Sequence, residues 1–268
     1  MLVLGEGVFR VDLTLINMLV LFAGAIGIGF VSAVAGIGGG SLLVPFMVLA
    51  LNYDVKVAIA TSLLCTIVTS SSATSIYLRK GLVDMEAALL LEPTTALGAI
   101  IGAHVTLMLP AKVVREILGF ILLYVSIAML RKAFEKTQSK SITVKISSTR
   151  KLLGITISFL AGLTSGMFGI GGGVLKVPLM TLILGLPIKV AIATSSFMVG
   201  LTATSGEIVY LTRGLTDSLS AVVLASGIIP GAIIGAKCMR KLRSRIVRIV
   251  FSSILLYASI RLLYSVFM

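Results

Sequence analysis

The sequence predicts an all-α integral membrane protein made of two homologous repeats, on the evidence of composition, an internal duplication and long apolar runs. Of its 268 residues, 57% are hydrophobic and 12% are charged, and the mean hydropathy is +1.13. An ordinary soluble domain has about 25% charged residues, because its surface must face water. The composition therefore excludes ordinary soluble enzymes, nucleic-acid-binding proteins and disordered chains, and it indicates a chain that lies in the lipid bilayer.

The duplication has an offset of 133 residues. GIGGGSLLVP at 36–45 recurs as GIGGGVLKVP at 169–178, and KVAIATS begins at both Lys56 and Lys189. Between residues 36 and 132, 43 of 97 positions are identical to their counterparts. Identity at this level over so long a stretch indicates duplication of an ancestral unit. We divide the chain into a first transmembrane repeat at 1–130, a basic linker at 131–151 and a second transmembrane repeat at 152–268.

Each repeat contains four long apolar runs and one short run, which follows the glycine motif. The runs cover roughly 13–35, 42–51, 57–78, 87–109 and 113–130 in the first repeat, and 152–168, 174–186, 190–211, 219–239 and 246–267 in the second. A helix needs about 20 apolar residues to cross the hydrocarbon, and a ten-residue helix covers about half of that thickness. We therefore expect about four spanning helices and one half-helix in each repeat.

The basic residues predict the orientation. Lys and Arg number 23 against 10 Asp and Glu, and many of them lie in the linker and at 237–248. Cytoplasmic loops are enriched in Lys and Arg, so both stretches are expected in the cytoplasm of a cell that carries the protein in its plasma membrane. They share one face if the short run counts as a crossing, which gives inverted repeats. A short run that turns back would place them on opposite faces, and the charge pattern favours inversion.

The two GIGGG segments are the best candidates for a binding site. The sequence has one histidine and none of the common catalytic motifs, so neither an enzyme nor a cofactor or metal site is expected. Glycines permit unusual backbone angles, and the exposed N–H groups at a helix start attract anions. The alternative is that the glycines only permit close helix packing. The candidate glycines are Gly36, Gly38, Gly39 and Gly40 in the first repeat and Gly169, Gly171, Gly172 and Gly173 in the second.

Five further side chains are candidates for binding the same anion. Thr61, Ser62, Thr194 and Ser195 occupy matching positions in the two repeats, and Lys176 lies within the second motif, where the first repeat has Leu43. The hydroxyl groups could donate hydrogen bonds to an anion, or they could bond to carbonyls of their own helices. The lysine could lie beside the anion, or its long side chain could extend to the membrane surface.

Two acidic residues lie inside apolar runs, where a charge is costly and usually faces an interior cavity. Glu92 and Glu207 could bind a proton or a sodium ion that couples or gates transport, or they could be held by hydrogen bonds from a neighbouring helix.

Tyr77 and Tyr210 occupy matching positions in the two repeats. Their positions near run ends suggest anchors at the membrane surface.

Duplicated GIGGG-x-L-x-VP motifs, each followed by KVAIATS and then by G-x-x-D and GAIIGA, resemble the TauE/SafE sulfite-exporter family. The resemblance covers nearly the whole chain apart from the first dozen residues and the linker. It implies export or exchange of small sulfur-containing anions such as sulfite, sulfoacetate or other organosulfonates. A passive anion channel, an uptake permease for thiosulfate or sulfate, and a membrane scaffold that transports nothing remain as alternatives. The expected partners are the small anion, the lipid bilayer and a coupling proton or sodium ion.

Overall fold

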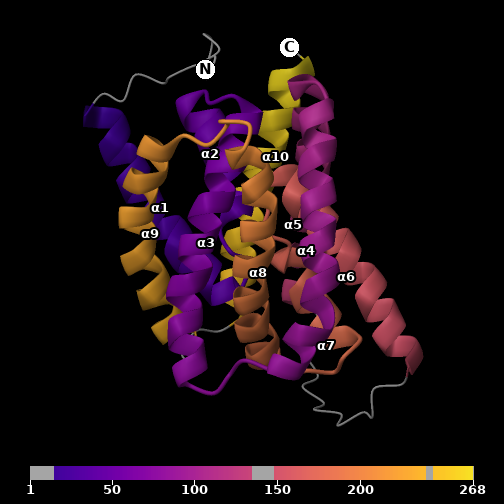
Figure 1. The fold of residues 1–268 in the computed structure, drawn as a ribbon. Helices are drawn as coiled ribbons and strands as arrows, with labels where there is room; N and C mark the ends of the chain where they lie inside the picture. The colour runs from indigo at the N-terminus through magenta and orange to yellow at the C-terminus, as the bar shows by residue number, and fades with distance from the viewer. Residues whose placement is uncertain (1–14, 135–147, 240–243, 268) are drawn as a thin grey trace.

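The computed structural model describes residues 15–134, 148–239 and 244–267, and over these residues it contains ten helices and no strand (Figure 1). Thirteen residues of the predicted linker, 135–147, lie outside this description. Each helix of the second half begins 133 residues after a helix of the first half. The helices are α1 (Leu15–Ala35), α2 (Gly40–Leu51), α3 (Val55–Arg79), α4 (Met85–Met108), α5 (Ala111–Phe134), α6 (Ser148–Phe168), α7 (Gly173–Leu182), α8 (Ile188–Leu211), α9 (Ser218–Cys238) and α10 (Ser244–Phe267).

Six helices in the described part of the chain are long and apolar enough to cross a membrane: α1 from Asn17 onward, α3, α4, α5, α8 and α9. The short helices α2 and α7 have 12 and 10 residues and begin at the last glycine of each motif. The sequence predicted four spanning helices in each repeat, so the six found in the described residues are fewer than predicted. The apolar part of α6, Leu152–Phe168, falls below spanning length.

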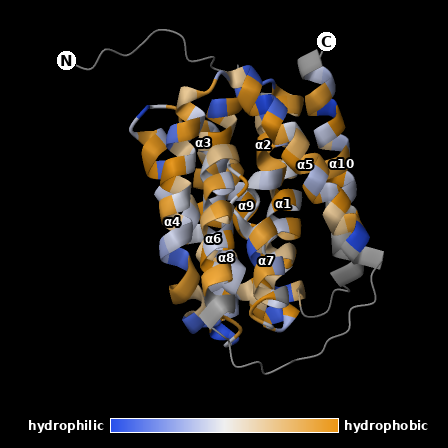
Figure 2. Ribbon diagram, turned by 90° about the vertical axis from the view of Figure 1, so that its right-hand side faces the viewer, coloured by the Kyte–Doolittle hydropathy of each residue, from blue (hydrophilic) through white to orange (hydrophobic). Residues whose placement is uncertain are grey.

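The outer surface of the helical bundle is apolar. Large hydrophobic side chains point outward from α1, α4, α5, α6, α8, α9 and α10, with Leu89 72% exposed and Met108 84% exposed. Hydrophilic residues gather toward the two ends of the bundle (Figure 2). A soluble monomer rarely exposes so much apolar surface, whereas lipid tails cover it at no cost. The structure thus agrees with the predicted membrane location.

Two helix pairs approach so closely that only glycine fits between them. On α9, Gly227, Gly231 and Gly235 lie against the backbone of Phe22, Ile26 and Phe30 on α1. Residue numbers rise together along both helices, so α1 and α9 run parallel. The pair α4 and α6 is built in the same way, with Gly98 and Gly102 of α4 against the backbone of Phe159 and Leu163 of α6. Here the glycines of the GAIIGA segments pack helices together, as small residues commonly do in membranes.

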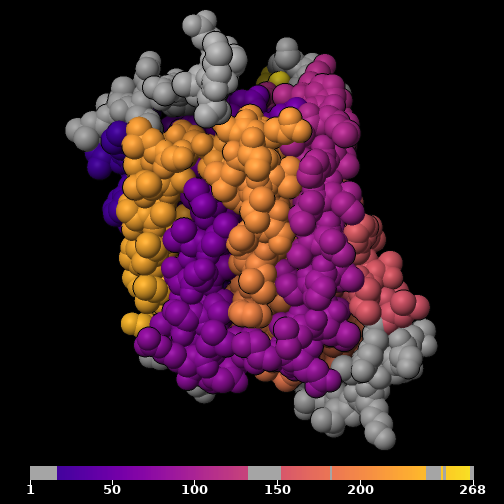
Figure 3. Space-filling view, in the orientation of Figure 1, coloured from indigo at the N-terminus to yellow at the C-terminus, as the bar shows by residue number. Residues whose placement is uncertain are grey.

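Helices α3 and α8 cross the centre of the molecule in opposite directions. Leu63 of α3 lies near Gly206 of α8, while Ser70, further along α3, lies near Gly200, which is earlier in α8. Helix α9 packs beside α3 and α4 beside α8, so the four run side by side across one face (Figure 3). The central pair therefore joins the two halves of the chain.

Helix α2 turns back along α1 and does not continue the crossing. The ring of Phe46 in α2 lies against Gly24 of α1, and α2 lies toward one end of the bundle while α7 lies toward the other (Figure 1). The expectation that the short run adds a crossing was therefore wrong. The ends of α3 and α9 lie together at one end of the bundle, because the Lys80 ammonium just after α3 donates to the carbonyl of Ala236 near the end of α9 at 3.3 Å. Whether the linker and 237–248 share a face stays a prediction, because most of the linker lies outside the described residues.

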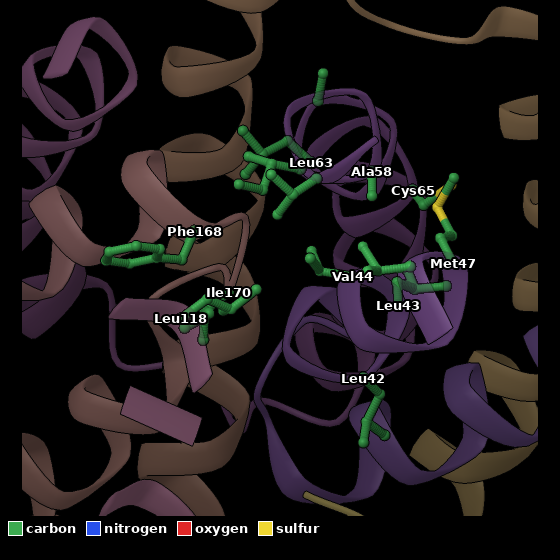
Figure 4. Close-up of a cluster of buried hydrophobic side chains, with 14 of the residues drawn as sticks. Leu42, Leu43, Val44, Met47, Ala58, Leu63, Cys65, Leu118, Phe168 and Ile170 are labelled. Carbon is green, nitrogen blue, oxygen red and sulfur yellow. The ribbon is translucent and has the colours of Figure 1, made fainter. Parts of the chain in front are cut away.

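The main apolar core forms where the two halves meet. Leu43, Val44 and Met47 of α2 lie on one side, and Phe168 and Ile170, which flank the start of the second glycine motif, lie on the other (Figure 4). All five side chains are at most 4% exposed. The core therefore fixes the short helix of the first half relative to the glycine segment of the second.

Candidate functional site

The two glycine segments, residues 36–40 and 169–173, are buried and lie in contact with each other. A Cβ atom on Gly40 would overlap the carbonyl oxygen of Gly169, and one on Gly173 would lie 2.5 Å from the carbonyl oxygen of Gly36. Six glycines in these segments have positive φ values, which other residues rarely adopt: Gly36, Gly38, Gly39, Gly169, Gly171 and Gly172. Close packing and backbone conformation together explain why both segments require glycine.

Close packing does not explain why several backbone N–H groups of these segments lack a hydrogen-bond acceptor. Among the described residues, the N–H groups of Gly38, Gly39, Gly40 and Ser41 find no hydrogen-bond acceptor, and neither do those of residues 170–174. Buried backbone N–H groups without a partner are rare in proteins. Each set lies at the start of a short helix, where the helix dipole adds partial positive charge. The arrangement provides two clusters of free donors that an anion can accept from.

Hydroxyl groups without partners surround the first glycine segment. The side-chain oxygens of Ser32, Ser41 and Thr66 are buried and make no hydrogen bond within the described structure. The Thr66 oxygen lies 3.1 Å from the place that a Cβ of Gly40 would take, and the Ser32 oxygen lies 3.4 Å from that of Gly39. The sequence analysis missed these residues. Thr66 has Val199 as its counterpart, so the duplication gave no signal there.

Ser62 and Ser195 contact the glycine segments, but through carbonyls. The Ser195 hydroxyl donates to the carbonyl of Gly36 at 2.8 Å, and the Ser62 hydroxyl lies 3.4 Å from the carbonyl of Gly169. Ser62 also donates to Ile59 of its own helix at 2.8 Å. Each serine thus holds the glycine segment of the other half in place.

Thr61 and Thr194 lie away from the glycine segments and support loops. Thr61 accepts from the amide of Asp217 at 3.1 Å, and Thr194 accepts from the amide of Asp84 at 2.9 Å. The two bonds are equivalent under the 133-residue offset. Both threonines therefore act on the connections that precede α9 and α4.

Lys176, Glu92 and Thr202 form a buried polar cluster from three helices. The lysine ammonium lies 3.2 Å from a Glu92 carboxylate oxygen and 2.5 Å from the Thr202 hydroxyl, which itself donates to Glu92 at 2.7 Å. Lys176 is fully buried, so its side chain does not extend to the membrane surface. The structure brings two predicted candidates, Lys176 and Glu92, into contact and adds Thr202. The sequence could have pointed to Thr202, because its counterpart in the first repeat, Thr69, is identical.

Glu207 lies apart from that cluster, further along α8. One carboxylate oxygen accepts from the Thr216 hydroxyl at 2.6 Å, and the other is buried without a partner.

The prediction that Tyr77 and Tyr210 are anchors at the membrane surface was wrong, because both side chains are fully buried. Their hydroxyls donate at 2.6 and 2.8 Å to the carbonyls of Ala33 and Gly166, just before the glycine motifs.

An apolar exterior, helices of spanning length and two short helices that begin at contacting glycine segments define a multi-pass membrane protein with the broken helices typical of transporters. The chain belongs to the TauE/SafE sulfite exporter family, because the family model described as "Sulfite exporter TauE/SafE" matches residues 21–262. It is therefore a membrane transporter of that family.

Two bacterial relatives and an archaeal one cover most of the chain. "Probable membrane transporter protein YunE" of Bacillus subtilis is 31% identical over 255 residues, which is 88% of this chain and 93% of the relative. "Probable membrane transporter protein YdhB" of the same organism is 30% identical, over 82% of this chain and 88% of the relative. MJ0441 of Methanocaldococcus jannaschii is 27% identical, covering 85% and 88%. No solved structure matches the chain.

Proposed function

We propose that this protein exports or exchanges small sulfur-containing oxyanions, such as sulfite, sulfoacetate or other organosulfonates, across the cell membrane by alternating access. The observation that carries the proposal is the set of buried, unpaired N–H groups at the two contacting glycine segments. An oxyanion bound there would supply the missing acceptors, and the hydroxyls of Ser41 and Thr66 would add donors. The family's name, sulfite exporter, supports this class of substrate.

The contact between the two segments implies a moving part. In this conformation the backbone of Gly40 touches that of Gly169, so the amides face tightly packed neighbours. Separation of the two halves would open the glycine segments to one face of the membrane and then to the other. A rigid-body motion of one repeat against the other is the usual route of alternating access.

Inverted repeats support this motion. Helices α3 and α8 are counterparts under the 133-residue offset, and they run antiparallel. We infer that each half makes an odd number of crossings because the pair α1 and α2 returns to the face where α1 began. The basic ends of α3 and α9 then face the cytoplasm, as the enrichment of Lys and Arg there favours.

The membrane potential supports export as the direction of transport. An interior-negative potential favours exit of an anion by about 2.3 kcal/mol per charge at 100 mV, so export needs no second ion. Uptake of thiosulfate or sulfate would require one. Glu207 is then the better proton acceptor of the two acids, because one of its oxygens has no partner whereas Glu92 already faces the Lys176 ammonium.

The test compares two glycines that both have a positive φ. Gly39 has φ 98° and lies in the proposed site, whereas Gly214 has φ 66° and would carry a Cβ with nothing within 4 Å. Gly39→Ala is expected to abolish saturable sulfite counterflow in proteoliposomes and the thermal shift that sulfite produces in detergent. Gly214→Ala also places alanine at a positive φ, in open space, and is expected to retain both. Equal responses from both variants would place the anion elsewhere, and flux without saturation would indicate a channel.

A further inference from the structure

A polar cavity of about 390 Å³ lies far from the glycine segments, at the end of the molecule where α2 ends. Its walls come from the end of α2, the turn that follows, the start of α5 and the end of α10. The lining residues are Val48, Leu49, Asn52, Tyr53, Arg115, Arg261, Tyr264 and Ser265. None of them belongs to the proposed transport site or to the Lys176 cluster.

Two arginines give this cavity its charge. The Nε atom of Arg115 is buried and has no hydrogen-bond partner within the described structure. Neither Arg115 nor Arg261 forms an ion pair in the described part of the chain, where the ion pair found joins Lys176 and Glu92. A guanidinium group held at a cavity wall is normally paired with an anionic group, because its fixed donors match carboxylate and phosphate oxygens. The buried, unpaired Nε of Arg115 therefore indicates an anionic ligand, and the exposed Arg261 adds a second positive charge at the same cavity.

The cavity lining contains two arginines and no acidic residue, and the Asp217 carboxylate that is bonded to its wall does not neutralise these arginines. The Tyr53 hydroxyl donates to Asp217 at 3.2 Å and also contacts the Ser220 hydroxyl. Asp217 further accepts from the Ser220 hydroxyl at 2.6 Å and from the amide of Leu219 at 3.2 Å. Its carboxylate is thus engaged at the start of α9. The cavity keeps a net positive wall.

We propose that this cavity binds a phosphate- or sulfonate-type oxyanion, held by the guanidinium groups of Arg115 and Arg261. The side chains of Val48 and Leu49 give the cavity an apolar edge beside its cationic wall. Its place at helix ends puts it at the level of lipid headgroups. The oxyanion therefore comes either from an anionic phospholipid or from a small ion in the surrounding water. This inference does not rest on the proposed transport function.

The experiment measures thermal stabilisation of the purified full chain in a neutral detergent. The probes are dioctanoyl phosphatidylglycerol, dioctanoyl phosphatidylcholine and inorganic phosphate. Three proteins are compared: the wild type, the double variant Arg115→Gln/Arg261→Gln, and the control variant Arg213→Gln. Arg213 is exposed in the loop before Asp217, so it lies at the same end of the molecule but outside the cavity. If the double variant does not fold, Arg261→Gln alone replaces it in the comparison, because Arg261 is exposed and its substitution should not disturb folding.

We expect phosphatidylglycerol, but not phosphatidylcholine, to stabilise the wild-type protein. The apparent Kd for phosphatidylglycerol should be at least tenfold weaker in the double variant or in Arg261→Gln. It should be unchanged in the Arg213→Gln control. A response to phosphatidylglycerol alone identifies the lipid headgroup as the source. A response to inorganic phosphate with the same dependence on the arginines identifies a free oxyanion. The proposal is overturned if neither anion stabilises wild type, or if the arginine variants respond as wild type does.

Discussion

At the scale of single residues, the most informative feature is a buried charge pair present in one half only. Lys176 and Glu92 have Leu43 and Ala225 as their counterparts, while Thr202 has an identical counterpart, Thr69. The same position in the fold therefore tolerates an apolar pair in one half. A charge pair in the other half costs desolvation that its mutual attraction must offset. The presence of such a pair in one half only indicates a role other than stability.

Replacement of one partner is expected to cost far more than replacement of both. Lys176→Leu leaves Glu92 buried beside Thr202 without its cation and should destabilise the protein by about 3–5 kcal/mol. The double variant Lys176→Leu with Glu92→Ala copies the pair of the first half and should recover most of that loss. Denaturant unfolding in detergent measures both. Additive losses in the double variant would show that the pair is not coupled.

The hydroxyl of Ser195 is expected to stabilise the glycine segment of the other half. Ser195→Ala removes the donor to the buried carbonyl of Gly36 and should cost about 1–3 kcal/mol. Ser205 on the same helix is only partly buried and makes a solvent-exposed hydrogen bond to Leu201, one turn earlier, so Ser205→Ala is the control and should change stability less. Thermal unfolding of both variants in one detergent gives the comparison. Similar melting temperatures for the two variants would contradict the assigned role.

At the scale of helices, glycine decides which pairs can touch. Gly231 of α9 packs directly on the backbone of Ile26 of α1, whereas a Cβ at the neighbouring Gly27 would meet nothing within 4 Å. Gly231→Ala should therefore separate the helices and cost about 1–3 kcal/mol. Gly27→Ala should leave the melting temperature unchanged or slightly raised, since alanine is the better helix former. Equal destabilisation by both changes would mean that the α1–α9 contact is looser than described.

The sequence predicted the helices well because their signals are local. Apolar runs and the position of the glycine motifs gave the starts of α2 and α7 closely. The return of α2 along α1 could not be predicted, since an apolar run of that length suits a half-crossing in either direction. Only the contact between Phe46 and Gly24, between two helices, fixes it.

The candidate site was predictable where the duplication marks it and not elsewhere. The glycine segments and the serines at 62 and 195 repeat, and they do meet in space. Thr61 and Thr194 repeat equally well, yet they bond loop amides, because identical spacing carries no information on which way a side chain points. Tyr77 and Tyr210 were misplaced for a related reason. A tyrosine near a run end suits the membrane surface or a buried carbonyl, and the choice depends on packing.

At the scale of the whole molecule, the antiparallel course of α3 and α8 makes a prediction about the two faces of the membrane. Lys80 and Arg213 are counterparts under the 133-residue offset, and both are exposed just after their helices. In inverted repeats such counterparts lie on opposite faces, whereas parallel repeats place them on the same face. The pair therefore separates the two topologies without reference to the positive-inside rule.

Single cysteines at these two positions test the arrangement. The chain has two cysteines of its own, so Cys65→Ala with Cys238→Ala provides the background, and Lys80→Cys and Arg213→Cys are introduced one at a time. A membrane-impermeant thiol reagent should label position 213 in intact cells and position 80 only in inside-out vesicles, because the positive-inside rule favours the cytoplasm for the ends of α3 and α9, which lie together. Labelling of both positions from the same side would exclude inverted repeats.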